Sequence, residues 1–364
     1  MSVRLIIDDC ISGLRSLEDE SVDCVVTSPP YWGLRDYGVD GQIGLELTLG
    51  EHLEVMCAVF DEVKRVLKPS GTCWVNYGDC YATSPNGRSA ADTKELSDDD
   101  RTFRDKPFST VQGSMKPKDL CMVPNRFAIA MQDAGWWVRS EIIWAKPNPM
   151  PESIKDRPAG AHEKIWLFTK SQKYDYDADA VLQPTSKNTH ARLSQDVMAQ
   201  VGSDRANGGK KTNGRMKAVA RKQKNLDRPR PHSFHKARVK DKDNDSFDSA
   251  LALTVTERNL RNYEPAPVDV WNIPTAAFSE AHFATFPPAL AERCILAGCP
   301  EGGVVLDPFG GAGTTGLVAD RLQRDCILIE LNPEYAEIAD KRINKDRGAL
   351  LDMMETNSQE AMEL

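Results

Sequence analysis

A glycine-rich turn between an apolar strand and a helix constrains the fold of this chain more than any other segment. The strand is predicted at Val304–Leu306, and the turn leads into a helix that begins at Thr314. Within the turn, Gly311-x-Gly313-x-x-Gly316 has the spacing that lets a backbone approach a nucleotide-like ligand closely at a helix N-terminus. The segment therefore predicts an α/β fold that binds such a ligand.

An acidic residue stands where such folds bind ribose hydroxyls. Glu330 ends the next predicted strand, Cys326–Glu330, 19 positions after Gly311. A nicotinamide enzyme is one interpretation of this pattern. Asp307 argues against it, because an anion beside the turn would repel a pyrophosphate, whereas it suits a cationic ligand that carries an amino group. Phe309 can cover an adenine or a sulfonium, so the turn predicts S-adenosylmethionine, with NAD as the alternative.

A second chemical motif directly follows the apolar strand Cys24–Thr27. Proline fixes its own φ and disfavours the helical region for the residue before it, so Pro29 and Pro30 hold a stiff, extended turn with free carbonyls. The Ser28 hydroxyl and the Pro29 carbonyl can both accept hydrogen bonds from one amino group, and Tyr31 can stack on a planar base. The alternative is a Ser-Pro turn that only ends a strand.

The remaining segments alternate between strand and helix patterns, as α/β proteins do. In the helix predicted from Glu51 to Leu67, apolar residues recur every three or four positions and form one buried face. Further strands are predicted at Leu5–Ile7, Gly71–Asn76, Ser140–Trp144, Lys164–Phe168 and Val270–Ile273, and further helices at Asn125–Ala134 and Pro287–Gly298. The segment beyond Gly348 is predicted to fray.

Positive charge is concentrated in one segment of an acidic chain. The 364 residues carry a formal net charge of −8, yet residues 186–262 hold 18 basic and only 8 acidic residues. This excess predicts a surface that contacts nucleic-acid phosphates, although a segment poor in large apolar residues also fits a solvated linker. The residues expected to contact DNA are Arg221, Lys222, Lys224, Arg228 and Arg230.

The cysteine pattern predicts neither disulfides nor a metal site. The nine cysteines are scattered without a CxxC pair or zinc-ligand spacing, so they are expected to be reduced and mostly buried. His232 and His235 have no further ligand beside them. The chain also has no apolar run of about 18 residues and no signal-peptide pattern at Met1–Ile7, which predicts a cytoplasmic protein without a membrane partner.

Together the two motifs resemble those of the amino-methylating DNA methyltransferases of the N4-cytosine/N6-adenine type. The family's catalytic motif, Asp/Ser/Asn-Pro-Pro-Tyr, stands here as Ser28-Pro29-Pro30-Tyr31. Its cofactor motif supplies the expected S-adenosylmethionine-binding residues, which are Asp307, Phe309, Gly310, Gly311, Gly313, Thr314, Thr315 and Glu330. The order of catalytic motif, basic insertion and cofactor motif resembles the permuted β-class.

This resemblance implies a Rossmann-like, S-adenosylmethionine-dependent methyltransferase sheet with four regions along the chain. Residues 1–182 are the catalytic part, 183–267 the basic target-recognition insertion, 268–347 the cofactor-binding part and 348–364 a flexible tail. The implied partner is double-stranded DNA, with a restriction endonuclease as a possible counterpart, in a bacterial or phage-encoded system. A monomer or a homodimer fits this family.

The implied reaction is site-specific transfer of a methyl group to the exocyclic amino group of a base flipped out of the duplex. Ser28 in place of the commoner Asp resembles the cytosine-N4 subgroup, and adenine N6 is the alternative. A cytosine-C5 enzyme would need a nucleophilic Cys, typically in a Pro-Cys pair, which this chain lacks. An NAD-binding Rossmann enzyme and a non-catalytic DNA-binding protein are the remaining alternatives.

Overall fold

The computed structural model describes residues 2–34, 39–83, 109–182, 268–276 and 286–362. The chain divides into two compact units, one formed by Met1–Tyr176 with Val268–Leu364 and the other by Asp177–Pro267. All helices and strands of the described residues belong to the first unit. The five residues expected to contact DNA, Arg221, Lys222, Lys224, Arg228 and Arg230, lie outside the described residues.

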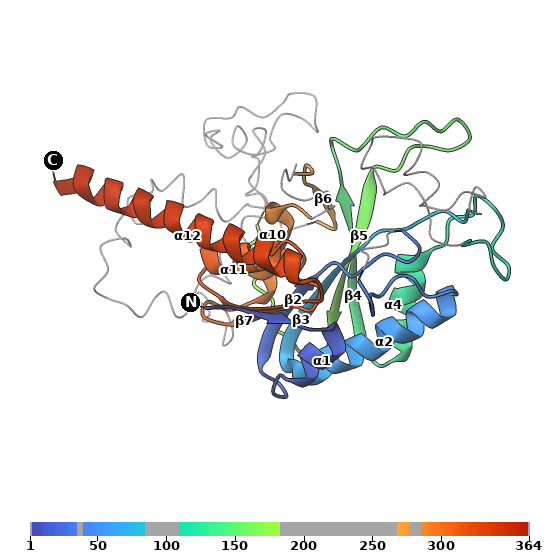
Figure 1. The fold of residues 1–364 in the computed structure, drawn as a ribbon, viewed down its shortest axis with the longest axis horizontal. Helices are drawn as coiled ribbons and strands as arrows, with labels where there is room; N and C mark the ends of the chain where they lie inside the picture. The colour runs from blue at the N-terminus through green and yellow to red at the C-terminus, as the bar shows by residue number, and fades with distance from the viewer. Residues whose placement is uncertain (1, 35–38, 84–108, 183–267, 277–285, 363–364) are drawn as a thin grey trace, which may run out of the picture. The chain divides into compact units, whose positions relative to one another are not determined.

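One mixed sheet of eight strands organises the described part of the first unit (Figure 1). In spatial order the strands are β1 (Val3–Ile7), β8 (Asp325–Glu330), β7 (Val304–Asp307), β2 (Val22–Thr27), β3 (Leu67–Tyr77), β5 (His162–Thr169), β4 (Trp137–Ala145) and β6 (Val270–Asn272). Strand β5 is antiparallel to both of its neighbours, and all other pairs are parallel. The predicted α/β fold is confirmed, and each predicted strand is present.

Helices cover both faces of this sheet (Figure 1). On one face lie α1 (Cys10–Arg15), α2 (Leu49–Val66) and α4 (Val123–Asp133), and on the other lie α10 (Pro288–Gly298), α11 (Thr314–Arg321) and α12 (Pro333–Met362). Two helical layers around a mostly parallel sheet give the Rossmann-like architecture that the sequence predicts.

Local sequence accounts for the bounds of α2. Thr48 and Glu51 form a capping box, in which each side chain accepts a hydrogen bond from the other residue's backbone N–H. The helix ends at Val66 because Pro69 disfavours a helical conformation for the preceding residue, and β3 begins directly at Leu67. The apolar face of α2 is buried against the sheet, as its periodicity predicts.

Two helical segments differ from the sequence-based expectations. Helix α1 has only six residues, too few for a periodic pattern, and begins where the Asp9 carboxylate accepts hydrogen bonds from the N–H groups of Ile11 and Ser12, both at 3.0 Å. Helix α12 continues past Gly348 to Met362, where the sequence predicts fraying. No proline follows Gly348, so nothing in the backbone there stops a helix.

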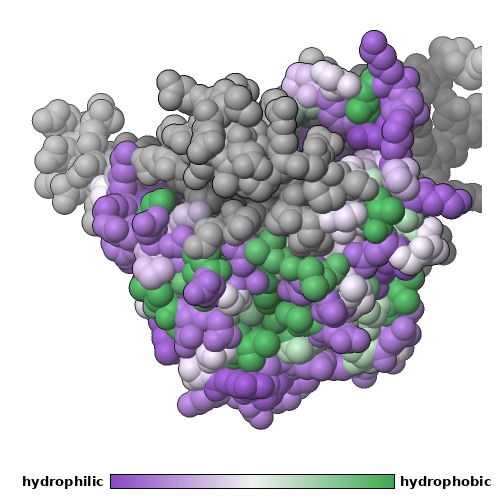
Figure 2. Space-filling model, turned by 45° about the vertical axis from the view of Figure 1, so that its right-hand side comes forward, coloured by the Kyte–Doolittle hydropathy of each residue, from purple (hydrophilic) through white to green (hydrophobic). Residues whose placement is uncertain are grey.

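The core is rich in thiols and aromatic rings. All nine cysteines are unpaired in the structure, and eight of them are buried, as the sequence predicts for most of them. The face seen in Figure 2 carries hydrophobic residues among hydrophilic ones. Among the described residues, no helix combines the length and the apolar character that a membrane span requires.

Candidate active site

The two sequence motifs meet at the middle of the sheet. Strands β7 and β2 are parallel neighbours, and the chain leaves them in opposite directions, from β7 to β8 and from β2 to β3. In open α/β sheets such a switch in strand order leaves a crevice beyond the carboxyl ends of the two strands. Here β7 ends at Asp307 and β2 ends at Thr27, so both motifs begin at this crevice.

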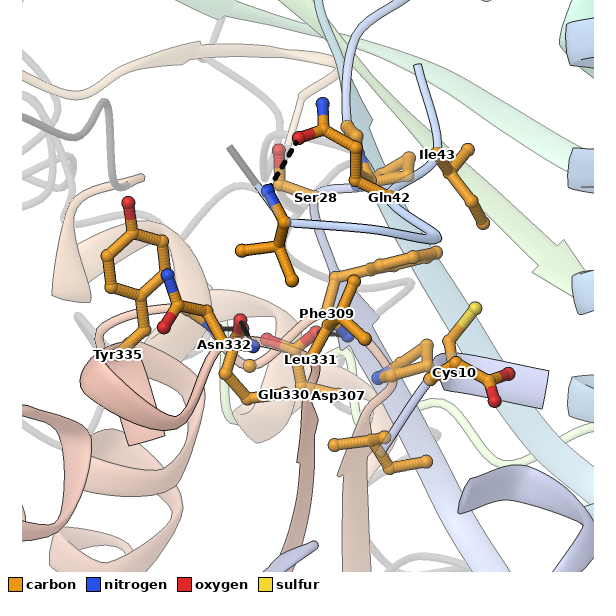
Figure 3. Close-up of a pocket in the computed structure, with 18 of the residues that line it drawn as sticks. Cys10, Ser28, Gln42, Ile43, Asp307, Phe309, Glu330, Leu331, Asn332 and Tyr335 are labelled. Atoms are coloured by element: carbon orange, nitrogen blue, oxygen red, sulfur yellow. Dashed lines mark hydrogen bonds between the residues drawn. The ribbon is translucent and has the colours of Figure 1, made fainter. Parts of the chain in front are cut away.

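A cavity of about 650 Å³ lies there (Figure 3). The predicted site residues that line it are Ser28, Pro29, Pro30, Tyr31, Asp307, Phe309, Gly310, Gly311, Thr314 and Glu330. Figure 3 shows Ser28, Phe309 and Glu330 around this common space. Gly313 and Thr315 do not line the cavity and instead shape the turn beneath it.

The backbone favours glycine at two positions of this turn. Gly313 has φ of +74°, and a Cβ added to it would lie 2.8 Å from the Cβ of Ala339 in α12. Gly311 also has positive φ, at +51°. Arg342 of α12 stabilises the turn by donating to the Ala312 carbonyl at 3.0 Å and to the Thr314 hydroxyl at 2.9 Å.

Asp307 is buried, with 1% of its surface exposed, and its carboxylate is held by three donors. One oxygen accepts from the Thr27 hydroxyl at 2.6 Å and from the Phe309 N–H at 3.1 Å, and the other lies 2.7 Å from the Thr315 hydroxyl. Burial nevertheless raises the pKa of Asp307 to about 7. The carboxylate therefore orders both turns, a role that the sequence does not indicate.

Glu330, at the end of the neighbouring strand β8, is fixed by backbone groups and lines the same cavity. Its carboxylate accepts hydrogen bonds from the N–H of Gly311 at 2.7 Å and of Asn332 at 2.9 Å. Burial raises the pKa of Glu330 above its ordinary value. Because the side chain lines the cavity and both oxygens are oriented, it suits recognition of hydroxyl groups on a bound ligand.

The catalytic motif is connected to three polar residues of the neighbouring strands and their ends. The Ser28 hydroxyl donates to the Tyr31 hydroxyl at 3.4 Å, which in turn donates to the Glu163 carboxylate at 2.8 Å. Asn76 donates to the same Glu163 oxygen at 3.0 Å, and Lys146 forms an ion pair with the other oxygen. The sequence predicts the motif but not this network.

The ring of Tyr31 is packed tightly on its β3 side. The centroids of the Tyr31 and Tyr77 rings lie 5.5 Å apart, and a Cβ added to Gly78 would lie 2.3 Å from Cε2 of Tyr31. Trp32, which follows in sequence, is buried and donates to the Glu46 carbonyl at 2.9 Å. Trp32 is thus a packing residue, whereas Tyr31 stands at the cavity.

Several residues that line the cavity could not be identified as site residues from the sequence. Gln42 and Ile43 come from the loop that precedes α2, and Cys10 comes from the short helix α1. Asn332 and Tyr335 could have been found from their position, because they follow Glu330 at the end of β8. Within the described residues, no group of three or more His, Cys, Asp or Glu is placed to hold a metal ion.

Comparison with known proteins decides the family of this chain. The family model described as DNA methylase, for N6 and N4 enzymes, matches residues 22–341. The chain belongs to the N6/N4 DNA methylase family. It is therefore a DNA methyltransferase that takes its methyl group from S-adenosylmethionine and transfers it to an amino group of a base.

Curated relatives agree with this assignment over nearly the whole chain. The type II methyltransferase M.XycI of Xanthomonas campestris pv. cyanopsidis is 40% identical over 335 residues, which is 92% of this chain and 85% of that protein. M.SmaI of Serratia marcescens, also a type II methyltransferase, is 37% identical over 346 residues, covering 95% and 92% of the two chains.

A solved structure supports the fold. The PvuII DNA methyltransferase, described as cytosine-N4-specific, superimposes with a TM-score of 0.51 at 20% sequence identity, over 97% of this chain and 93% of that chain. At this identity the similarity concerns the fold alone. The predicted Rossmann-like sheet is thus confirmed. The family assignment, rather than this structural similarity, excludes an NAD-binding enzyme and a non-catalytic DNA-binding protein.

Proposed function

We propose that this DNA methyltransferase modifies the N4 amino group of cytosine, at a base that Ser28, Pro29, Pro30 and Tyr31 receive. The observation that carries the proposal is that these four residues and six of the eight predicted cofactor-binding residues line one cavity. The hydrogen bond between Thr27 and Asp307 joins the two motifs. A methyl donor bound by one motif and an amino group bound by the other would meet within this space.

The chain's own groups suit the cofactor. S-adenosylmethionine supplies an electrophilic methyl group when bound. Glu330 is oriented for the ribose hydroxyls, the Phe309 ring lies along the cavity, and Gly311 brings the backbone close to the ligand. Asp307 adds negative charge near the cationic ligand. Because its carboxylate already accepts hydrogen bonds from three protein donors, we infer that its main role is to hold the two turns in place.

The catalytic turn acts on the base by orientation. The Ser28 hydroxyl and the Pro29 carbonyl accept hydrogen bonds from the amino hydrogens, while Tyr31 stacks on the ring. This arrangement draws the nitrogen lone pair out of conjugation and aligns it with the methyl group. Because the amino group is inaccessible inside a duplex, the base must be flipped out, at a cost of a few kcal/mol.

The preference for cytosine over adenine rests on the subgroup that Ser28 resembles, since the chemistry of its hydroxyl tolerates either base. A neutral hydroxyl accepts from the amine without adding a fixed charge, whereas the commoner Asp stabilises a positive nitrogen more strongly. The serine form resembles the cytosine-N4 subgroup. Adenine N6 remains the second candidate, since both bases present an exocyclic amine.

The biological setting follows from the relatives and from charge. The curated relatives are type II methyltransferases, so we assign this chain to a restriction-modification system, with a restriction endonuclease as its counterpart in a bacterial cytoplasm. Residues 183–267 would recognise the target sequence, because their basic excess suits phosphate contacts. A monomer or a homodimer would serve this role.

The base is identified by incubating the enzyme with mixed-sequence duplex DNA and labelled S-adenosylmethionine and then separating the nucleosides. We expect label in N4-methylcytosine, and we expect Ser28→Ala to abolish it while DNA binding is retained. Label only in N6-methyladenine would refute the cytosine assignment. Unchanged turnover of Ser28→Ala would refute the assignment of the catalytic turn.

A further inference from the structure

Glu163 connects the catalytic turn to residues that neither motif contains. It lies at the start of β5, antiparallel to β4, and faces Trp144 in register, so Lys146 just beyond β4 reaches its carboxylate. One carboxylate oxygen pairs with Lys146 and the other accepts from Tyr31 at 2.8 Å and from Asn76 at 3.0 Å. Its side chain retains 20% of its surface exposed, so the carboxylate also has access to water.

The chemistry of these groups fixes the direction of each hydrogen bond. An ionised carboxylate only accepts, so the single hydrogen of the Tyr31 hydroxyl is committed to Glu163. The Tyr31 oxygen then acts as an acceptor, and it receives the single hydrogen of Ser28 at 3.4 Å. Consequently the Ser28 oxygen is left as an acceptor for an amine that enters the cavity.

We propose that Glu163 is a positioning residue that sets Ser28 as an acceptor and receives, through Tyr31 and Ser28, the proton that the target amine releases. The proposal rests on the proposed role of Ser28. It differs from that role because Glu163 does not line the cavity and acts only through the two hydroxyls.

The relay balances atoms and charge. The nitrogen lone pair forms the bond to the methyl group, and the sulfur–methyl bond breaks with its electron pair left on sulfur. The methylated nitrogen, now positive, gives one proton to the Ser28 oxygen as Ser28 passes its own hydrogen to Tyr31 and Tyr31 passes its own to Glu163. A neutral methylamine and a protonated Glu163 result, and Glu163 then releases the proton to water.

Single-turnover methylation by Glu163→Gln, Tyr31→Phe and the double variant tests this relay. Each single variant keeps the shape of its side chain, and each should slow the chemical step roughly 10²-fold, within the usual range for proton transfer. The Kd values for S-adenosylmethionine and for DNA should stay close to those of wild type. Because both changes break one relay, the double variant should be no slower than the slower single variant.

Glu141→Gln is the matched control, since Glu141 is a carboxylate of β4 that pairs with Lys164 rather than with the catalytic turn. It should keep the wild-type rate. A wild-type rate in Glu163→Gln, or a double variant whose defect equals the product of the single defects, would overturn the relay. If Glu163→Gln fails to fold, the rate of Tyr31→Phe decides alone, and a wild-type rate rejects the proposal.

Ser28→Ala separates this inference from the proposed function. A large defect in Ser28→Ala beside normal turnover in Glu163→Gln rejects the relay and leaves the catalytic turn in place. Normal turnover in Ser28→Ala rejects both.

Discussion

Thr27 and Asp307 stand 280 residues apart in the chain, yet the Thr27 hydroxyl donates to the Asp307 carboxylate at 2.6 Å. Thr27 is the last residue of β2, and Asp307 is the last residue of β7. The bond therefore joins the turn assigned to the target base with the turn assigned to the cofactor. Both residues are buried, with 1% of their surface exposed, so water cannot replace this hydrogen bond.

Thr27→Val should weaken both folding and cofactor binding. The substitution keeps the shape of the side chain but leaves a buried carboxylate oxygen with one donor fewer, which costs about 1–3 kcal/mol. We expect a loss of stability of this size in denaturant unfolding and a rise in the Kd for S-adenosylmethionine of roughly tenfold in calorimetry. Thr72→Val is the control, because Thr72 is equally buried but donates to the Gly298 carbonyl. It should lower stability only.

Asp307 should make stability and cofactor binding depend on pH in opposite directions. Its pKa rises from an ordinary 3.8 to about 7 on folding, so its contribution to stability is present below pH 3.8 and is lost as pH rises through 7. The ionised form attracts a cationic ligand, so affinity for S-adenosylmethionine should increase as the pH rises through about 7.

Calorimetry of wild type and Asp307→Asn, below and above the Asp307 pKa of about 7, tests the predicted pH dependence of S-adenosylmethionine binding. Binding by wild type should release protons, and Asp307→Asn should bind more weakly with a flatter pH dependence. Burial also raises the pKa of Glu330, which should shift the affinity in the same direction. A wild-type Kd that does not change across this pH range would contradict this prediction.

Gly78→Ala should impair catalysis by displacing Tyr31. The added Cβ would meet the ring at 2.3 Å, and the ring must move away from the position that its bond to Glu163 fixes. A misplacement near 1 Å can slow a reaction about 10²-fold, so we expect a kcat loss of this order. Gly50→Ala in the first turn of α2 is the control, since its nearest neighbour is 3.9 Å away. Equal kcat values for the two variants would show that Tyr31 adapts.

The basic segment should govern the salt dependence of DNA binding. Neutralising Arg221, Lys222 and Lys224 should weaken binding and reduce the slope of log K against log salt by roughly 0.9 for each phosphate that the protein no longer neutralises. In the control variant, three basic residues of the first unit are neutralised instead, namely Arg15, Lys341 and Lys345. If both triple variants show the same slope, residues 186–262 do not bind phosphates preferentially.

The parts of the site that were predicted from sequence are those whose geometry is encoded locally. The prolines at 29 and 30 stiffen the catalytic turn by themselves, and the glycines at 311 and 313 permit a backbone that other residues resist. The sheet was predicted because strands β2, β7 and β8 are short apolar runs bounded by turns. These features require only neighbours in sequence.

The network around Glu163 could not be predicted in the same way. Its hydrogen bonds with Tyr31 and Asn76 and its ion pair with Lys146 depend on β5 pairing antiparallel with both β3 and β4, and nothing in the sequence states that register. Helix α1 was not predicted because a helix of six residues is too short to show a periodic pattern of apolar residues. Only part of the role of Asp307 could be predicted, for a related reason: its donors Thr27 and Thr315 come from separate elements.

The pairing of early strands with late ones has a consequence for synthesis on the ribosome. Strand β1 pairs with β8 and β2 pairs with β7, so the first two strands of the chain adjoin strands that are translated only after residue 303. Pairings this distant in sequence form slowly and cannot form before both partners exist. A nascent chain that has already exposed its catalytic turn therefore lacks the part of the cavity that follows β7 and β8, and methylation must wait until both of these strands have been made.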